Sequence, residues 1–68
     1  MNEETFNLSI RKFLKMVGVK SQHDIEQAVA KAIAEGTIVG TESFPAKVTL
    51  KVPGLQLDVA FDGEIRLQ

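Results

Sequence analysis

Apolar residues recur at helical spacing in the first half of the chain. Over residues 3–17 they come at steps of three and four, the pattern of one face of an amphipathic helix. This face consists of Phe6, Ile10, Phe13, Leu14 and Val17. Glu3 and Glu4 lie in the first turn, where the helix dipole favours acidic side chains. Gly18 predicts the end of the helix.

A second helix is predicted to begin near Ser21 and to stop at Gly36. Ser21 is a favourable N-cap, and Asp24 three residues later gives an arrangement like a capping box. The apolar face consists of Ile25, Ala28, Val29, Ala32 and Ile33. Its alanines allow another element to approach closely, so we expect this helix to lie under a sheet or against the first helix.

After a mostly polar connection, residues 37–43, the apolar period changes to two, which predicts strands. The apolar positions are Phe44, Ala46, Val48, Leu50 and Val52, then Leu55, Leu57, Val59 and Phe61. Pro53 and Gly54 predict the turn between the two strands. With Val52 opposite Leu55, every apolar residue of one strand meets an apolar residue of the other. Ile38 and Val39, in the connection, form either a short strand or a plug in the core.

Asp62 and Gly63 predict a second turn, followed by a short third strand over residues 64–67. A two-residue loop there pairs Phe61 with Glu64 and turns Ile65 and Leu67 away from the face of Phe61. A three-residue loop with a bulge returns them to the core. If the tight turn holds, an apolar outer patch results, and its members are the candidate interface residues Ala60, Ile65 and Leu67.

These patterns predict one α+β domain over residues 1–68. Two N-terminal helices pack on one face of a small C-terminal antiparallel sheet of about three strands. The predicted core consists of Phe6, Ile10, Phe13, Val17, Ile25, Val29, Ile33, Val48, Leu50, Leu57, Val59 and Phe61.

Composition narrows the class of protein. The chain has 44% apolar residues and no cysteine, so a globular domain without disulfides is expected. One histidine and no thiolate make a structural zinc site untenable, and no metal or cofactor is predicted. No apolar run approaches the ~18 residues of a membrane helix, and the polar, acidic start differs from a signal peptide. We therefore expect a cytoplasmic protein that does not bind membranes.

Catalytic residues are not evident. His23 and Asp24 are adjacent, so on a helix they point in different directions and do not form a base and its orienting partner. Asp58, Asp62 and Glu64 gather near one sheet edge with lysines opposite, which favours solvated cross-strand pairs. The sequence predicts that the protein is not an enzyme.

A local basic excess supports a nucleic-acid or polyanion hypothesis. Residues 11–20 carry a charge of +4 from Arg11, Lys12, Lys15 and Lys20. Two helices around Gly18 followed by a hairpin also resemble a reduced winged helix-turn-helix. Against this, the second helix would present Asp24 and Glu26 to phosphate, and the whole chain has a net charge of −1. Polyanion binding by a degenerate helix-turn-helix is therefore the alternative prediction.

The first prediction is a small protein-interaction or regulatory module. Its partner is an unidentified protein or a second copy of the chain in a homodimer.

Several segments resemble a family of short, uncharacterised proteobacterial proteins. They are residues 6–15 (FNLSIRKFLK), 17–19 (VGV), 21–22 (SQ), 45–50 (PAKVTL) and 62–65 (DGEI). The family is a domain of unknown function, so the resemblance implies a bacterial origin and assigns no functional residues.

Overall fold

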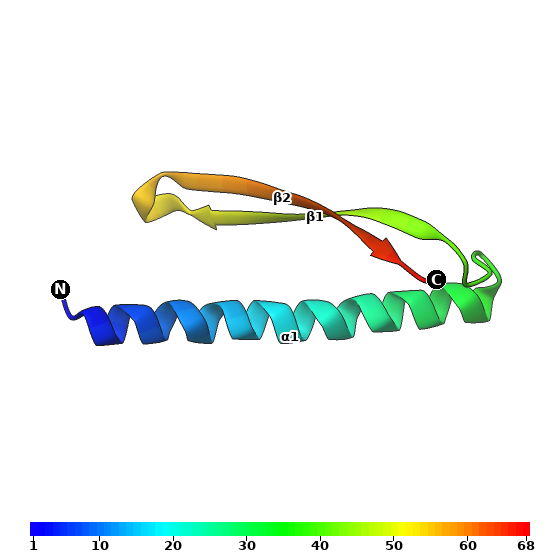
Figure 1. The fold of residues 1–68 in the computed structure, drawn as a ribbon, viewed down its shortest axis with the longest axis horizontal. Coiled ribbons are helices and arrows are strands. Elements are labelled where there is room, and N and C mark those ends of the chain that lie inside the picture. The colour runs from blue at the N-terminus through cyan, green and yellow to red at the C-terminus, as the bar shows by residue number, and fades with distance from the viewer. The chain divides into compact units, whose positions relative to one another are not determined.

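A computed structural model describes the whole chain, Met1–Gln68 (Figure 1). In chain order it contains helix α1 (Glu3–Glu35), strand β1 (Ser43–Val52), the 3₁₀ turn η1 (Pro53–Leu55) and strand β2 (Leu57–Arg66). The α+β class is confirmed, whereas two helices and three strands are wrong. Two compact units divide the chain: α1 belongs to Met1–Glu35, and the hairpin of β1 and β2 belongs to Gly36–Gln68.

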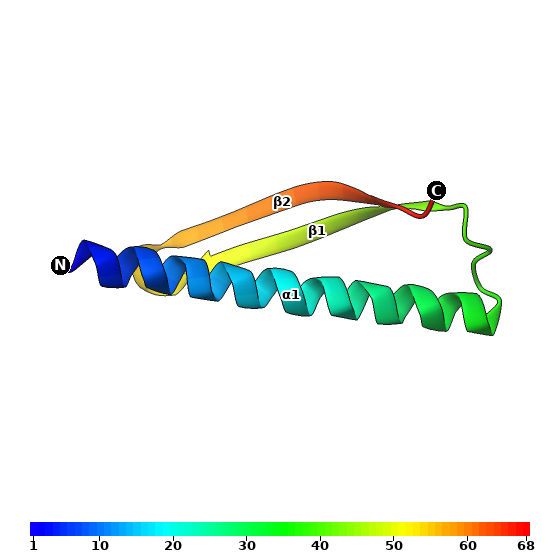
Figure 2. The same cartoon turned by 60° about the horizontal axis from the view of Figure 1, so that its bottom comes forward.

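Helix α1 continues through Gly18 without a break (Figure 2). A glycine inside a helix costs only about 1 kcal/mol relative to alanine, and no proline accompanies it here. The predicted cap at Ser21 does not form. Instead, Asp24 forms an ion pair with Lys20, one turn earlier, with 3.1 Å between Lys20 Nζ and Asp24 Oδ2. This pair joins the two segments that the sequence pattern had separated.

Both ends of α1 have recognisable caps. At the start, the side-chain Oδ1 of Asn2 accepts a hydrogen bond from the Thr5 amide at 3.1 Å. The Asn2 carbonyl accepts another from the Phe6 amide at 3.0 Å. At the other end Gly36 has a φ of +76°, the left-handed conformation that ends helices, so the predicted stop at Gly36 is confirmed.

Members of the two predicted apolar faces line up in one stripe along α1, with Ser21 between them. The stripe recurs at steps of four, four and three residues: Phe6, Ile10, Leu14, Val17, Ser21, Ile25, Ala28 and Ala32. This spacing has an 11-residue repeat, whose period is slightly longer than one helical turn. The stripe therefore moves gradually around α1, and its two halves resemble separate helices in the sequence.

The hairpin has a longer connection and a different register than predicted. Val52 lies opposite Leu57, not Leu55, and residues 53–56 form the connection. Two-residue hairpin loops require a positive φ at their first residue, which the ring of Pro53 forbids. Pro53 instead opens η1, and Gln56, with a φ of 54°, closes the connection. The Gln56 amide donates to the Pro53 carbonyl at 3.0 Å.

No turn occurs at Asp62 and Gly63. Strand β2 passes straight through them, with Asp62 opposite Lys47 and Gly63 opposite Ala46. The predicted third strand is thus the C-terminal part of β2. An uninterrupted β2 matches all ten residues of β1 and keeps Ile65 on the face of Phe61, which a tight turn would have prevented.

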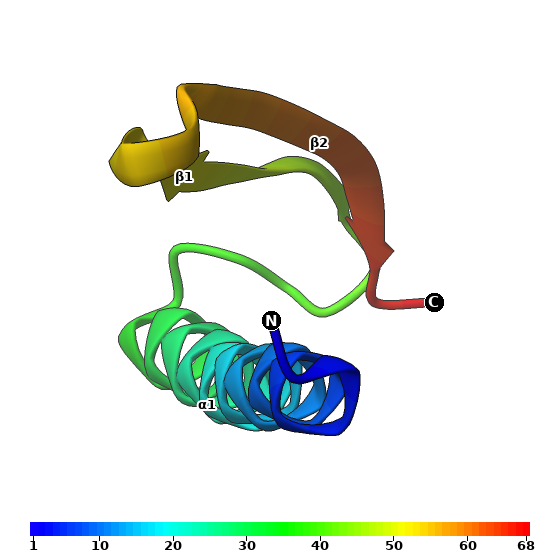
Figure 3. The same cartoon turned by 90° about the vertical axis from the view of Figure 1, so that its left-hand side faces the viewer.

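The register sorts the hairpin into two chemically distinct faces. The apolar face consists of Phe44, Ala46, Val48, Leu50 and Val52 from β1 and Leu57, Val59, Phe61, Gly63 and Ile65 from β2. The polar face consists of Ser43, Pro45, Lys47, Thr49 and Lys51 from β1 and Asp58, Ala60, Asp62, Glu64 and Arg66 from β2. The pair of strands twists along its length (Figure 3), as two-stranded ribbons do.

Neither unit forms a core by itself. Phe13 of α1 and Phe61 of the hairpin, both expected in the core, are 46% and 56% exposed. A single helix and a two-stranded ribbon are each one layer of structure, and a core requires a second layer against the apolar side. Each unit therefore has an apolar side that it does not cover itself.

We predict that Gly18→Ala stabilises α1. A Cβ at position 18 would meet no atom within 4 Å, and alanine is favoured over glycine in a helix by about 1 kcal/mol. Thermal unfolding followed by circular dichroism at 222 nm should show a higher midpoint for the variant.

Gly36→Ala is the matched control for this substitution. Position 36 is equally open, but its φ of +76° strains any residue with a Cβ. This variant should unfold at a lower temperature than the parent. A destabilised Gly18→Ala variant would mean that α1 is not continuous at that position.

Candidate functional site

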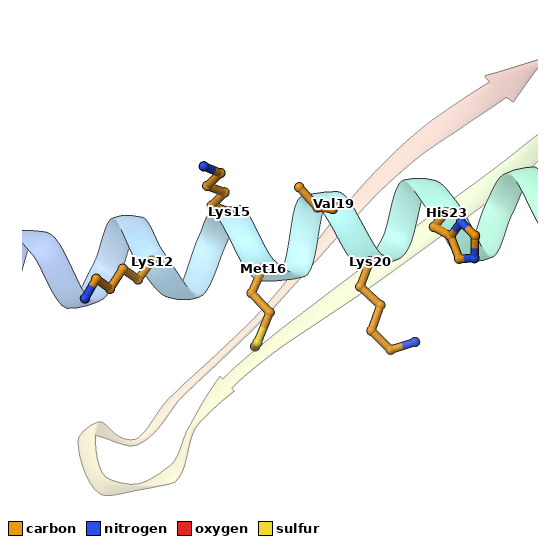
Figure 4. Close-up of a pocket in the computed structure, with 6 residues that line it drawn as sticks. All are labelled: Lys12, Lys15, Met16, Val19, Lys20 and His23. Atoms are coloured by element: carbon orange, nitrogen blue, oxygen red, sulfur yellow. The ribbon is translucent and has the colours of Figure 1, made fainter.

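The basic residues of α1 meet on one side of the helix only in part. Lys12, Lys15 and Lys20 line an open pocket together with Met16, Val19 and His23, all from α1 (Figure 4). Arg11 is not among the lining residues, although it lies one helical turn from Lys15. Figure 4 shows the three lysine side chains pointing in different directions from the helix. Their ammonium groups thus do not converge on a single small anion.

Lys20 is also engaged within the helix. It forms an ion pair with Asp24, which partly neutralises its charge, and both side chains are well exposed. Such exposed pairs contribute at most about 1 kcal/mol, so a competing phosphate could displace the carboxylate. Since α1 is continuous through Gly18, the chain has no helix-turn-helix geometry. What remains of the alternative prediction is a basic surface on one straight helix.

The predicted interface patch is divided by the register of the hairpin. Ala60 lies on the polar face opposite Thr49, whereas Ile65 lies on the apolar face opposite Phe44. Leu67 follows the end of β2, and its amide donates to the Glu42 carbonyl at 3.0 Å. Ile65 and Leu67 are half-buried, and Ala60 is exposed. The three residues therefore do not form a common patch.

A larger apolar surface is the whole apolar face of the hairpin. It combines Ile65 with residues that the sequence predicts to lie in the core. Val48, Val59 and Phe61 are exposed on it. The alternation of apolar and polar positions predicts this face, but as part of a core and not as a surface.

The polar face carries opposite charges on its two strands. Lys47 and Lys51 of β1 lie directly opposite Asp62 and Asp58 of β2. None of these four side chains comes within ion-pair distance of another charged group. Glu64 instead accepts a hydrogen bond from the Ser43 hydroxyl at 2.6 Å. The arrangement is that of solvated cross-strand neighbours, as expected from the sequence.

Glu42 organises the loop that precedes β1. One carboxylate oxygen, Oε2, accepts a hydrogen bond from the Val39 amide at 2.9 Å. The other, Oε1, accepts from the amides of Gly40 at 2.9 Å and Thr41 at 3.0 Å. These bonds, led by the one from Val39, lower the pKa of the Glu42 carboxyl because they favour its charged form. Gly40, with a φ of +104°, lets the loop curl around the carboxylate.

Other chemical possibilities are limited. No group of three histidine, cysteine, aspartate or glutamate side chains is placed to hold a metal ion. Asp24 pairs with Lys20 and not with the neighbouring His23. No part of α1 is apolar enough over a sufficient length to cross a bilayer.

A long helix followed by a two-faced hairpin defines the architecture. The chain belongs to a family of unknown function, DUF6494, whose model matches residues 1–68. This confirms the resemblance to a domain of unknown function. No curated protein and no solved structure matches the chain.

We predict that the carboxyl of Glu42 titrates below the ordinary glutamate pKa. Its folded pKa is lowered, so its contribution to loop order is present above the ordinary glutamate pKa and is lost as the pH falls through the lowered value. Carbon-detected NMR of the side-chain carboxyl should show the low midpoint. The amides of Val39, Gly40 and Thr41 should shift with the same midpoint.

Glu42→Gln is the control for charge. It retains one oxygen acceptor but no titration, so the pH-dependent shifts of the three loop amides should disappear. A Glu42 midpoint at or above the ordinary glutamate pKa would contradict the hydrogen bonds described for the loop.

Proposed function

We propose that this protein is a non-catalytic interaction module that works as a homodimer. One observation carries the proposal: α1 and the hairpin are each a single layer with an apolar side that the unit cannot cover by itself, and 44% of the residues are apolar. Exposed apolar surface is unfavourable in water by about 25 cal/mol per Å², which favours association. Small domains with too little core of their own commonly gain stability by oligomerisation.

The hairpin gives a second reason for a partner. A two-stranded hairpin by itself is at best marginally stable in water, and strands of ten residues with one apolar face need a covering layer. A second copy supplies both additional strands and additional apolar surface. We place the homodimer in the bacterial cytoplasm, where a protein without cysteine needs no oxidising conditions.

The first test is the oligomeric state of Phe61→Ser. We expect the wild-type chain to sediment as a dimer in analytical ultracentrifugation. Phe61 lies on the apolar face of the hairpin. Losing its burial from each copy should weaken the dimer by about 2 kcal/mol or more, which is over tenfold in Kd.

Lys51→Ser is the matched control, because Lys51 lies on the polar face of the same hairpin. It should leave the dimer constant within about threefold, a difference below 1 kcal/mol. At a chain concentration of about 1 mM, even a dimer with a binding free energy of only about −4 kcal/mol would be detected. A wild-type chain that is still monomeric at this concentration would contradict the proposal.

A second candidate function is the binding of a polyanion along α1. The observation that favours it is the shared surface of Lys12, Lys15 and Lys20. Because their ammonium groups diverge, an extended backbone of phosphates suits them better than one small anion.

Amide NMR with short duplex DNA and with RNA tests this candidate. Shifts centred on residues 11–20 that fade as salt rises would support it, since displaced counterions make such binding salt-dependent. Lys12→Ala with Lys15→Ala should remove the shifts, whereas Lys31→Ala, outside the basic cluster, should not. The absence of shifts at low salt would eliminate polyanion binding.

A further inference from the structure

The two edges of the hairpin present different backbone groups. The Leu67 amide donates to the Glu42 carbonyl, so these two residues form a hydrogen-bonded pair at the end of the ladder. Along an antiparallel ladder, hydrogen-bonded pairs alternate with pairs that are not hydrogen-bonded to each other. The even-numbered residues of β1 therefore bond to the odd-numbered residues of β2, and the remaining residues of both strands direct their backbone N–H and C=O groups outward.

The outer edge of β1 is protected. Pro45 is one of its outward residues and has no N–H group, so the row of donors is interrupted there. Lys47 and Lys51 stand on the same edge, and both proline and lysine are devices that discourage pairing of edge strands. Pro45 also fits the register, since a proline at an inward position would remove a bond to β2.

The outer edge of β2 has an unbroken row of donors. Its outward residues are Asp58, Ala60, Asp62, Glu64 and Arg66, and each has an N–H group. Four of them are charged, which discourages unselective pairing, but the strand contains no proline and no residue with a positive φ. It presents ten residues of regular ladder with no strand on that side. An edge of this form can accept another strand.

We propose that the outer edge of β2 pairs antiparallel with β2 of a second copy. The result is a four-stranded sheet in the order β1-β2-β2-β1, related by a twofold axis perpendicular to the sheet. This inference rests on the proposed homodimer and specifies its geometry. Only the β2 edge of each chain has a complete row of donors, so the pairing is isologous and stops at two copies.

The twofold axis joins like faces. It places the apolar faces of both hairpins on the same side of the sheet, so one continuous apolar surface forms. Charge favours one register: with Asp62 at the axis, Asp58 of each copy lies opposite Arg66 of the other, and these two attractive pairs outweigh the single like-charged pair of Asp62 with Asp62. With Phe61 at the axis, Asp58 would instead face Glu64, and with Gly63 at the axis Asp62 would face Glu64.

Two proline variants at directly opposite positions test the edge. Ala60→Pro removes an outward donor from β2, and Thr49→Pro removes one from β1, while both spare the bonds between β1 and β2. In analytical ultracentrifugation Ala60→Pro should raise the dimer Kd about tenfold or more, because each copy loses a hydrogen bond across the axis. Thr49→Pro should leave it within about threefold.

Cysteine cross-linking gives a test that does not require proline to be tolerated. The chain has no cysteine, so a single introduced thiol can pair only with its equivalent in the second copy. Asp62→Cys should form a disulfide-linked dimer on mild oxidation, since residues paired at the axis have Cα atoms about 5.5 Å apart. Lys47 lies opposite Asp62 but on the outer edge of β1. The Lys47→Cys variant should therefore remain a monomer on a non-reducing denaturing gel.

The outcomes separate this inference from the proposed function. A monomeric wild-type chain overturns both. A wild-type dimer that is unaffected by Ala60→Pro, and in which Asp62→Cys does not cross-link, leaves the homodimer standing and overturns pairing through β2. Equal weakening by Ala60→Pro and Thr49→Pro, with no cross-link, also overturns it.

Discussion

The fixed backbone angle of Pro53 is the constraint on which the hairpin depends. Because a proline cannot open a two-residue loop of the hairpin type, the chain uses four residues to reverse its direction. The longer connection sets Val52 opposite Leu57, and that register fixes every other cross-strand pair. The separation of apolar and polar faces, and the outward direction of the Pro45 nitrogen, both follow from it. One ring thus determines the chemistry of the faces and of the edges.

Patterns that extend over many residues predicted the structure better than single turn residues did. The alternation of apolar residues gave both strands and the correct sharing of faces, because a register error of two residues preserves the face of every side chain. Gly36 ended α1 as predicted, because its left-handed conformation has no competitor there. The predicted helix end at Gly18 and the predicted turn at Asp62 and Gly63 are both wrong. In both cases a regular element continuing on either side outweighed a local preference that costs only about 1 kcal/mol.

The candidate sites were predictable to a smaller extent. The basic residues of α1 were visible in the sequence, but their directions around the helix were not, and the ion pair of Lys20 with Asp24 depends on the continuity of α1. The grouping of Ala60 with Ile65 depended on a turn that does not form. Glu42 was overlooked because its role requires the loop conformation at Gly40. The difference between the two edges could not be predicted without the register of the strands. The presence of Pro45 alone does not show which side its backbone nitrogen faces.

The pairing of Ala46 with Gly63 has a consequence for whatever covers the hairpin. This is the one cross-strand pair on the apolar face without a large side chain, and it lies between Phe44 with Ile65 and Val48 with Phe61. The pair contributes only a methyl group and a hydrogen atom to this face, with larger side chains on either side. A covering layer that packs closely there needs a larger side chain at one defined position. The smallest pair of residues on the apolar face can thus determine how a covering layer is aligned on the hairpin.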